Sequence, residues 1–210
     1  ILILYVKNIL LRGSDKQFLG KLKKQLMDRF EMADLEDVSK VLGMNVTRDR
    51  ENGTVTIDQK DYLEGILERY DMTNCQVALT PGVGPEISLD QPADRILDEQ
   101  GKQRYHSIAG ALMYLAHVSR YDILYAANQL ARAMSKPLKA HMGAAENVFR
   151  YLAGSVIFPI TYKGGGFKLT TYTDANWGGN PVNGKLTSSY IVVLTNGPIR
   201  FKVGLQSPTA

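Results

Sequence analysis

The 210-residue sequence has few of the residues on which many kinds of site depend. It contains one cysteine, Cys75, together with three histidines and one tryptophan. A single cysteine excludes an internal disulfide framework, and so few histidines make a zinc site of cysteine and histidine ligands unexpected. No apolar run approaches the roughly 20 residues that span a bilayer, and the opening run lacks the features of a signal peptide. We therefore expect no membrane partner.

The charge balance is only mildly basic, with 25 lysines and arginines, 21 aspartates and glutamates, and a formal net charge of +4. This excess is compatible with a polyanionic partner but does not establish one. Hydrophobic residues make up 44% of the sequence and charged residues 22%, which is typical of a folded globular chain rather than a disordered one.

Both ends of the sequence interrupt predicted structure. Residues 1–6 form an apolar run typical of a buried central strand, which needs a neighbour on each side. The sequence stops a few residues after another strand-like segment, which ends near Val203. These ends predict that the chain is a piece of a longer polypeptide.

The first third predicts strands and two helices. A turn at Lys7-Asn8 is expected to join residues 1–6 to a short strand at 9–11. A helix follows with Ser14 as its N-cap, because apolar residues recur at every fourth position from residue 18 to residue 30. Its lysines fall mostly on the other side, which is usually only the solvated face of a helix.

A second hairpin is predicted over residues 41–57, since Asn52-Gly53 separates two strand-like runs. Asp58 is expected to cap the helix that follows. Residues 76–103 predict a linker or a long surface loop because they contain prolines and glycines and no sustained periodicity. Three helices are then expected, over residues 105–119, 122–134 and 138–152.

The last quarter is predicted to be rich in strands. Residues 159–162 and 168–173 are expected to form a hairpin around the turn Gly164-Gly165-Gly166, and residues 188–194 and 199–203 to form another around Asn196-Gly197. We expect this end to have no helix of its own to cover it, and an unpaired edge near residues 198–204. The whole sequence thus predicts an α+β fold.

Blocks along the whole sequence resemble the reverse transcriptases of copia-type retrotransposons. Residues 5–10, followed by Gly13-Ser14, are similar to the signature hairpin of that family, in which YVDD precedes an apolar pair. Other similar blocks, in the family's order, are residues 30–35, 42–44, 59–63, 105–115, 120–123 and 141–154. Residues 172–179 resemble the start of the ribonuclease H domain that the family carries downstream, and residues 184–190 continue it.

This resemblance implies three domains: a distal palm at residues 1–75, a linker with a helical thumb or connection at 76–155, and a truncated ribonuclease H-like domain at 156–210. It implies the distal palm strands and helices of a reverse transcriptase, followed by the N-terminal half of a ribonuclease H-like sheet. The implied partners are an RNA or DNA template–primer and the remainder of the polyprotein. The implied cofactor is Mg²⁺.

The hairpin that resembles the family's signature differs from it at the two residues that hold divalent ions in the family. Polymerases transfer nucleotides with two divalent ions held by carboxylates, and Mg²⁺ prefers such oxygen ligands. Lys7 and Asn8 stand where the family has its paired aspartates. Two like unit charges about 4 Å apart repel by roughly 4 kcal/mol at an effective dielectric constant of 20. We therefore expect no Mg²⁺ at this hairpin and no polymerase activity; the alternative is that Lys7 contacts a phosphate.

Asp174 is the carboxylate that the resemblance singles out in the last domain, where the family has the first metal ligand of its ribonuclease H site. It is either a catalytic, metal-binding remnant or a solvated residue that caps local structure. One aspartate cannot build a two-metal site, so ribonuclease activity is not expected either. Two functions remain open. The chain is an inactive remnant of an RNA-directed DNA polymerase with fused ribonuclease H, or a non-catalytic module that binds RNA–DNA hybrids.

Overall fold

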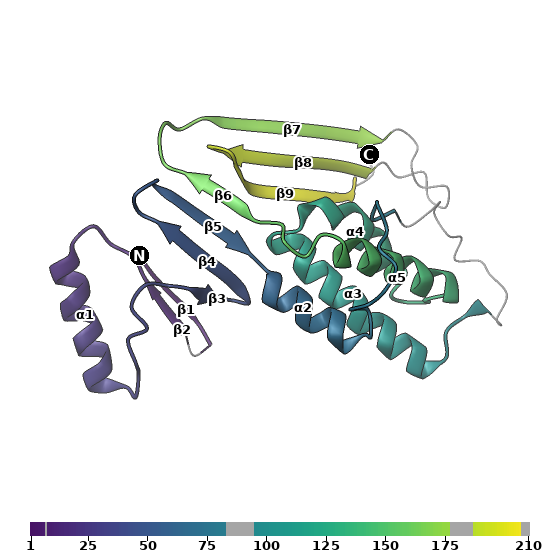
Figure 1. Ribbon diagram of the computed structural model, residues 1–210, viewed down its shortest axis with the longest axis horizontal. Coiled ribbons are helices and arrows are strands. Elements are labelled where there is room, and N and C mark those ends of the chain that lie inside the picture. The colour runs from purple at the N-terminus through teal and green to yellow at the C-terminus, as the bar shows by residue number, and fades with distance from the viewer. Residues whose placement is uncertain (7, 83–94, 177–186, 207–210) are drawn as a thin grey trace. The chain divides into compact units, whose positions relative to one another are not determined.

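The computed structural model describes residues 1–6, 8–82, 95–176 and 187–206 (Figure 1). These residues form five α-helices and a set of antiparallel strands, which confirms the predicted α+β class. The chain divides into two compact units, Ile1–Val41 and Leu42–Ala210. Part of the predicted linker, residues 83–94, lies outside the described residues.

The first unit consists of a short hairpin, one helix and a final short strand. Strand β1 (Leu2–Tyr5) pairs antiparallel with β2 (Asn8–Leu11), and Tyr5 lies opposite Asn8. Asn8 therefore belongs to a strand and not to the predicted turn. Every residue of β1 is exposed, so the expectation of a buried central strand is wrong for the unit as described. Strand β3 (Lys40–Val41) ends the unit.

Helix α1 (Lys16–Arg29) begins at a different cap from the predicted one. Its N-cap is Asp15, whose Oδ1 accepts the backbone N–H groups of Gln17 and Phe18 at 2.9 and 3.0 Å. The prediction of Ser14 was off by one residue. A carboxylate satisfies the free N–H groups of the first turn and also interacts favourably with the positive end of the helix dipole, which a serine hydroxyl does less well.

The second unit begins with the predicted hairpin. Strands β4 (Met44–Asp49) and β5 (Thr54–Asp58) are antiparallel, and Asp49 Oδ1 accepts the N–H groups of Glu51 and Asn52 in the connection. Strand β6 (Ile160–Lys163) pairs with β5, with Thr56 opposite Thr161.

The predicted hairpin of residues 159–162 with 168–173 is therefore wrong. The hydroxyls of Thr56 and Thr161 lie 3.0 Å apart, and Gly164 N–H donates to the Gly53 carbonyl at 2.8 Å. These contacts hold β6 on a strand about a hundred residues earlier in the chain, and the glycines after it lead into the next sheet instead.

Strands β7 (Leu169–Asn176), β8 (Thr187–Leu194) and β9 (Gly197–Leu205) form a three-stranded antiparallel sheet in that order. The predicted turn between β8 and β9 is confirmed. Thr195 and Asn196 have φ values of 45° and 74°, and asparagine tolerates this left-handed region better than most residues do.

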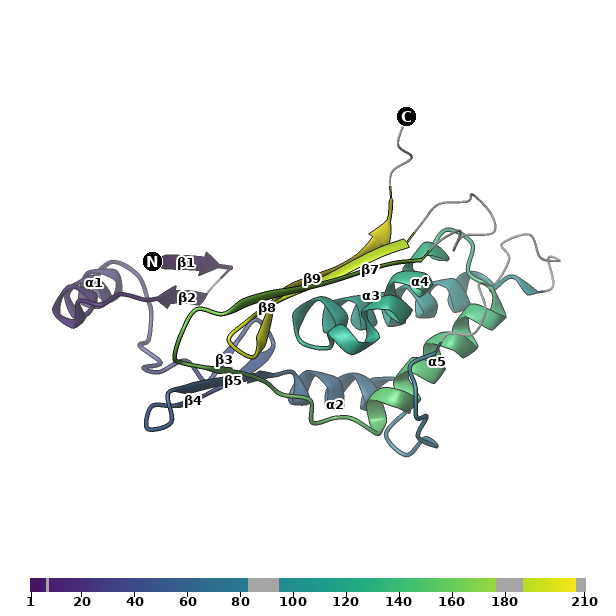
Figure 2. The ribbon, with the colours of Figure 1, turned by 90° about the horizontal axis from the view of Figure 1, so that it is seen from above.

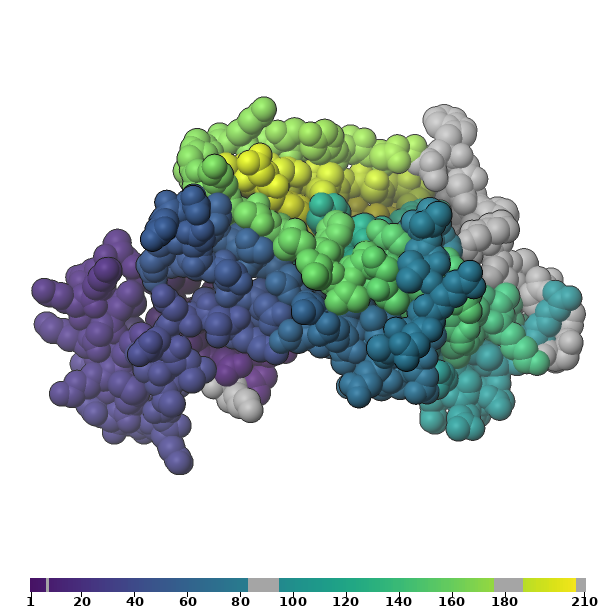
Figure 3. Space-filling view, in the orientation of Figure 1, coloured from purple at the N-terminus to yellow at the C-terminus, as the bar shows by residue number. Residues whose placement is uncertain are grey.

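Four helices of this unit pack around a common core: α2 (Lys60–Arg69), α3 (Glu99–Val118), α4 (Leu124–Arg132) and α5 (Lys139–Ala153). A 3₁₀ turn over Tyr121–Ile123 precedes α4. The rings of Tyr70 and Phe149 stack at 5.3 Å between the end of α2 and α5. In Figure 3 the atoms of α2, in blue, and of α5, in green, lie on the visible face of this unit.

The predicted helices are confirmed, with shifted starts. Helix α3 begins six residues earlier than predicted because Asp98 caps it and accepts the Gly101 N–H at 2.8 Å. The N-cap of α2 is Gln59 rather than Asp58, although Asp58 accepts the Lys60 N–H at 2.9 Å. None of the described helices has the length and apolar character that crossing a bilayer requires.

The last sheet is covered on one side by helices that precede it in the chain (Figure 2), and the described residues after Ser155 form no helix of their own, as expected. Phe201 and Val203 of β9 pack against the helical core. The outer edge of β9 is also partly capped, because Asn128 Nδ2 donates to the Val203 carbonyl at 3.0 Å and the Tyr162 hydroxyl to the Pro198 carbonyl at 2.7 Å. The predicted edge at residues 198–204 is thus only partly unpaired.

Candidate functional site

The tip of the β1–β2 hairpin is the place where the resemblance implies the paired aspartates of a polymerase. Asn8 is exposed at the start of β2, opposite Tyr5, and Val6 has a φ of 50°. Lys7 lies outside the described residues. Neither strand contains an aspartate or a glutamate. The described side chains at this tip are therefore a phenol, an isopropyl group and an amide, and none of them is a carboxylate.

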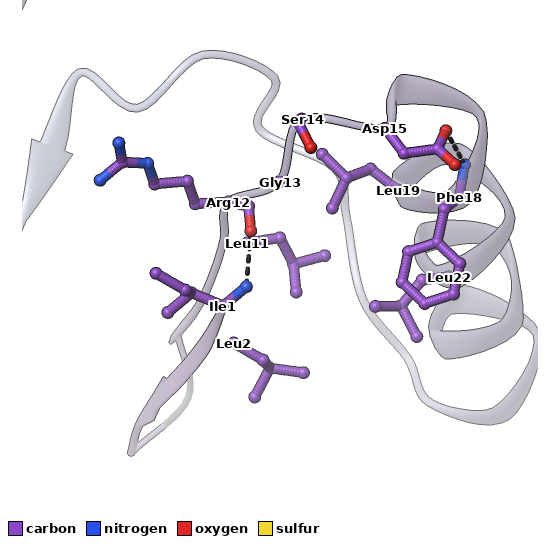
Figure 4. Close-up of a pocket in the computed structure, with 10 residues that line it drawn as sticks. All are labelled: Ile1, Leu2, Leu11, Arg12, Gly13, Ser14, Asp15, Phe18, Leu19 and Leu22. Carbon is purple, nitrogen blue, oxygen red and sulfur yellow. Dashed lines mark hydrogen bonds between the residues drawn. The ribbon is translucent and has the colours of Figure 1, made fainter.

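An open pocket of about 310 Å³ lies beside this hairpin, against the first turns of α1 (Figure 4). Its lining is mostly apolar and includes Leu2, Leu11, Phe18 and Leu22. Asp15 is its one carboxylate, and that group already accepts two backbone N–H groups as the cap of α1. The pocket therefore suits an apolar group better than a divalent ion.

Helix α1 carries the lysines noted in the sequence. Lys23 is neutralised by Asp34, with Nζ 2.8 Å from the carboxylate. The hydrogen bond from Lys23, with that from the Glu36 N–H, lowers the pKa of Asp34. Lys16, Lys21 and Lys24 are exposed. This helix thus presents cationic groups to the solvent.

Asp174 lies within strand β7, opposite Ser189 of β8, and is exposed. Among the described residues, no three histidine, cysteine, aspartate or glutamate side chains gather closely enough to hold a metal ion. Asp174 and Asn8 belong to different compact units.

Sequence reasoning missed a buried polar network around Arg120, whose side chain is 2% exposed. Its guanidinium donates to both oxygens of Asp122, at 2.7–3.2 Å, and to the carbonyl and hydroxyl oxygens of Ser155, at 2.7 Å each. The Tyr151 hydroxyl donates to the same carboxylate at 2.9 Å. Burial and this hydrogen bond raise the pKa of Tyr151. Each nitrogen of the guanidinium has a partner, so the network ties these elements together.

Comparison with known proteins establishes the chain's relatives. Residues 1–84 match the family described as reverse transcriptase (RNA-dependent DNA polymerase). The whole chain is 33% identical to the retrovirus-related Pol polyprotein from transposon TNT 1-94 of Nicotiana tabacum, and 94% of it is 32% identical to that from transposon RE1 of Arabidopsis thaliana. A putative transposon Ty5-1 protein of Saccharomyces cerevisiae is 26% identical over 93% of the chain. No solved structure matches the chain.

The chain spans 16%, 13% and 62% of the lengths of these three relatives, respectively. Its matched residues relate it to reverse transcriptases. More narrowly, the chain as a whole is similar to Pol polyproteins of copia-type retrotransposons.

Proposed function

We propose that this chain is a catalytically inactive reverse transcriptase region of a retrotransposon Pol polyprotein, followed by a ribonuclease H-like region. The observation that carries the proposal is the pair Lys7-Asn8 at the hairpin where the family has two aspartates. Asn8 stands in β2 as a neutral amide, and the two strands of the hairpin contain no carboxylate that could replace the missing pair.

The charge at this hairpin opposes the chemistry that a polymerase needs. Two aspartates would contribute −2, whereas Lys7 and Asn8 contribute +1. Repulsion between two unit positive charges about 4 Å apart costs roughly 4 kcal/mol at an effective dielectric constant of 20. Since about 1.4 kcal/mol is tenfold in affinity, this repulsion alone weakens metal binding by roughly three orders of magnitude.

The proposal assigns residues 1–75 to the distal palm, 76–155 to the linker and helical thumb, and 156–210 to the ribonuclease H-like domain. The matched residues 1–84 support the first assignment. The sheet of β7, β8 and β9 is the unit that we assign to ribonuclease H, with Asp174 on its first strand as the remnant of a metal ligand. An isolated aspartate leaves that region without the paired ions that hydrolysis would need.

A primer-extension assay tests the proposal. The chain is incubated with a primed RNA template, deoxynucleotides and either Mg²⁺ or Mn²⁺, next to the variant Lys7→Asp/Asn8→Asp and a full polymerase as the positive control. We expect no incorporation by the unaltered chain with either ion. Nucleotide incorporation by the unaltered chain would refute the proposal.

A second function, binding to nucleic acid without catalysis, is favoured by the exposed lysines Lys16, Lys21 and Lys24 on α1. Within that helix, Asp28 is the one acidic residue. Cations that neutralise phosphates release counterions, so the logarithm of the affinity then falls linearly with the logarithm of the salt concentration. Binding of the chain to an RNA–DNA hybrid with this dependence would support the function, and no binding at low salt would refute it.

A further inference from the structure

The sheet of β7, β8 and β9 has one face covered by helices and one face turned away from them (Figure 2). Side chains that lie directly opposite each other on antiparallel strands share a face. Phe201 and Val203 pack on the helical core, and their register partners Ile191 and Ser189 therefore point the same way. Asp174, opposite Ser189, belongs to this helix-side face as well.

The alternate residues define the other face, which we call the open face. Two rows cross it: Thr173, Tyr190 and Lys202 lie in register, and Thr171, Val192 and Arg200 form the next row. Both cations are exposed, and so are the two threonines. By the same register, the further described residues of this face are Leu169, Ala175, Ser188, Leu194, Gly197 and Gly204. None of the described residues on the open face is acidic.

The two cations are held side by side. Arg200 and Lys202 are two residues apart on one strand, a separation of roughly 6.6–6.8 Å along β9. Arg200 Nε donates to the Tyr190 hydroxyl at 3.0 Å, which fixes the guanidinium over the sheet. No described residue of the face accepts a hydrogen bond from its two terminal nitrogens, which are the donors that bind phosphate oxygens in a forked geometry.

We propose that the open face binds the sugar–phosphate backbone of a nucleic acid, with Arg200 and Lys202 as phosphate contacts and Tyr190 as the residue that positions Arg200. The inference rests on the second proposed function, nucleic-acid binding, and assigns that function to a surface other than α1. Charge complementarity argues for a polyanion, because the described residues of this face include two cations that attract one and no acidic group that would repel it. The threonine hydroxyls add donors of the type that commonly reach phosphate oxygens.

The test is an anisotropy titration of the full chain with a labelled 18-base-pair RNA–DNA hybrid between 50 and 300 mM KCl. The variants are Arg200→Gln, Lys202→Gln and Tyr190→Phe. Lys139→Gln is the matched control, because it removes one exposed cation from α5 on the helical side. Far-UV circular dichroism verifies that each variant is folded.

We expect the salt slope of the unaltered chain to become shallower by about 0.9 for each of Arg200→Gln and Lys202→Gln, as for the loss of one phosphate contact. Tyr190→Phe keeps both charges, so it should weaken binding and leave the slope unchanged. Lys139→Gln should leave affinity and slope unchanged.

Three results would overturn the inference in different ways. If the unaltered chain binds the hybrid and the open-face variants behave like Lys139→Gln, the open face is refuted and nucleic-acid binding survives. If the unaltered chain does not bind the hybrid at 50 mM KCl, both the open-face assignment and the nucleic-acid-binding function are refuted. Vesicles containing phosphatidylserine form a parallel arm: loss of vesicle binding in the open-face variants, with hybrid binding intact, would assign this face to a lipid surface and contradict the proposal.

Discussion

Replacing Arg120 by methionine should strongly destabilise the second unit. The change removes a guanidinium that is 2% exposed and keeps Asp122, whose side chain is 15% exposed and would retain only the Tyr151 hydroxyl as a side-chain donor. The carbonyl and hydroxyl oxygens of Ser155 lose their donors as well. Removing one partner of a buried ion pair costs about 3–5 kcal/mol, because the other charge stays buried without compensation.

The measurement is the free energy of unfolding from urea denaturation, followed by far-UV circular dichroism. For a unit of this size, the same loss corresponds to a decrease in Tm of about 6–20 °C. Arg120→Lys should lie between Arg120→Met and the unaltered chain, because it keeps the charge and loses the forked geometry. Arg200→Met is the matched control, since Arg200 is exposed, and it should change the free energy by less than about 0.5 kcal/mol.

The double variant Arg120→Met/Asp122→Leu distinguishes the stability lost by leaving a charge unpaired from the stability lost through poorer packing. Replacing both partners of a buried pair by apolar residues is often nearly neutral, so this variant should recover a large part of the stability that Arg120→Met loses. An Arg120→Met chain within about 1 kcal/mol of the unaltered chain would refute the reasoning, because a largely buried carboxylate that has lost its cation should cost more than that.

Two further predictions concern buried groups of the helical core. Tyr105 is fully buried and its hydroxyl donates to the Leu130 carbonyl at 2.7 Å, so Tyr105→Phe should lower the free energy of unfolding by about 1–3 kcal/mol in the same urea assay; an unchanged value would show that this bond contributes nothing. His141 is buried, accepts the Leu138 N–H on Nδ1, and has its pKa lowered by burial. The unfolded state then binds the proton more readily, so stability should be fully present above about pH 6.5 and fall as the pH drops below that value. His141→Gln should flatten this acid-side loss in a pH series of Tm, and an unaltered pH profile in that variant would contradict the assignment.

The sequence predicted those parts of the fold that depend on local pattern. The hairpins of β4 with β5 and of β8 with β9 follow from turn residues between strand-like runs, and the helical core follows from apolar periodicity. It did not predict the pairing of β6 with β5, because that choice depends on contacts such as Thr56 with Thr161 between distant residues. Turn chemistry at Gly164 to Gly166 marks a change of direction but does not name the partner strand.

The candidate sites likewise divide into features that the local sequence shows and features that depend on contacts between distant residues. The identities of Lys7 and Asn8 alone indicate that the hairpin lacks its carboxylates. The Arg120 network and the open face remained hidden because each depends on residues that meet only in three dimensions. Arg120 reaches Ser155 across 35 residues, and Arg200 becomes a neighbour of Tyr190 only through the register of β8 and β9. An alternation of cations with apolar residues on β9 was visible in the sequence, but not the face to which they point.

Paramagnetic broadening by Mn²⁺ tests most directly whether the hairpin has lost its metal site. Mn²⁺ is titrated into the labelled chain while the backbone amide signals of Tyr5 and Ile9, which flank the tip, are followed by NMR. The account predicts no selective broadening of these signals in the unaltered chain and selective broadening in Lys7→Asp/Asn8→Asp, where the charge of the pair changes from +1 to −2. Selective broadening of Tyr5 and Ile9 in the unaltered chain would contradict it.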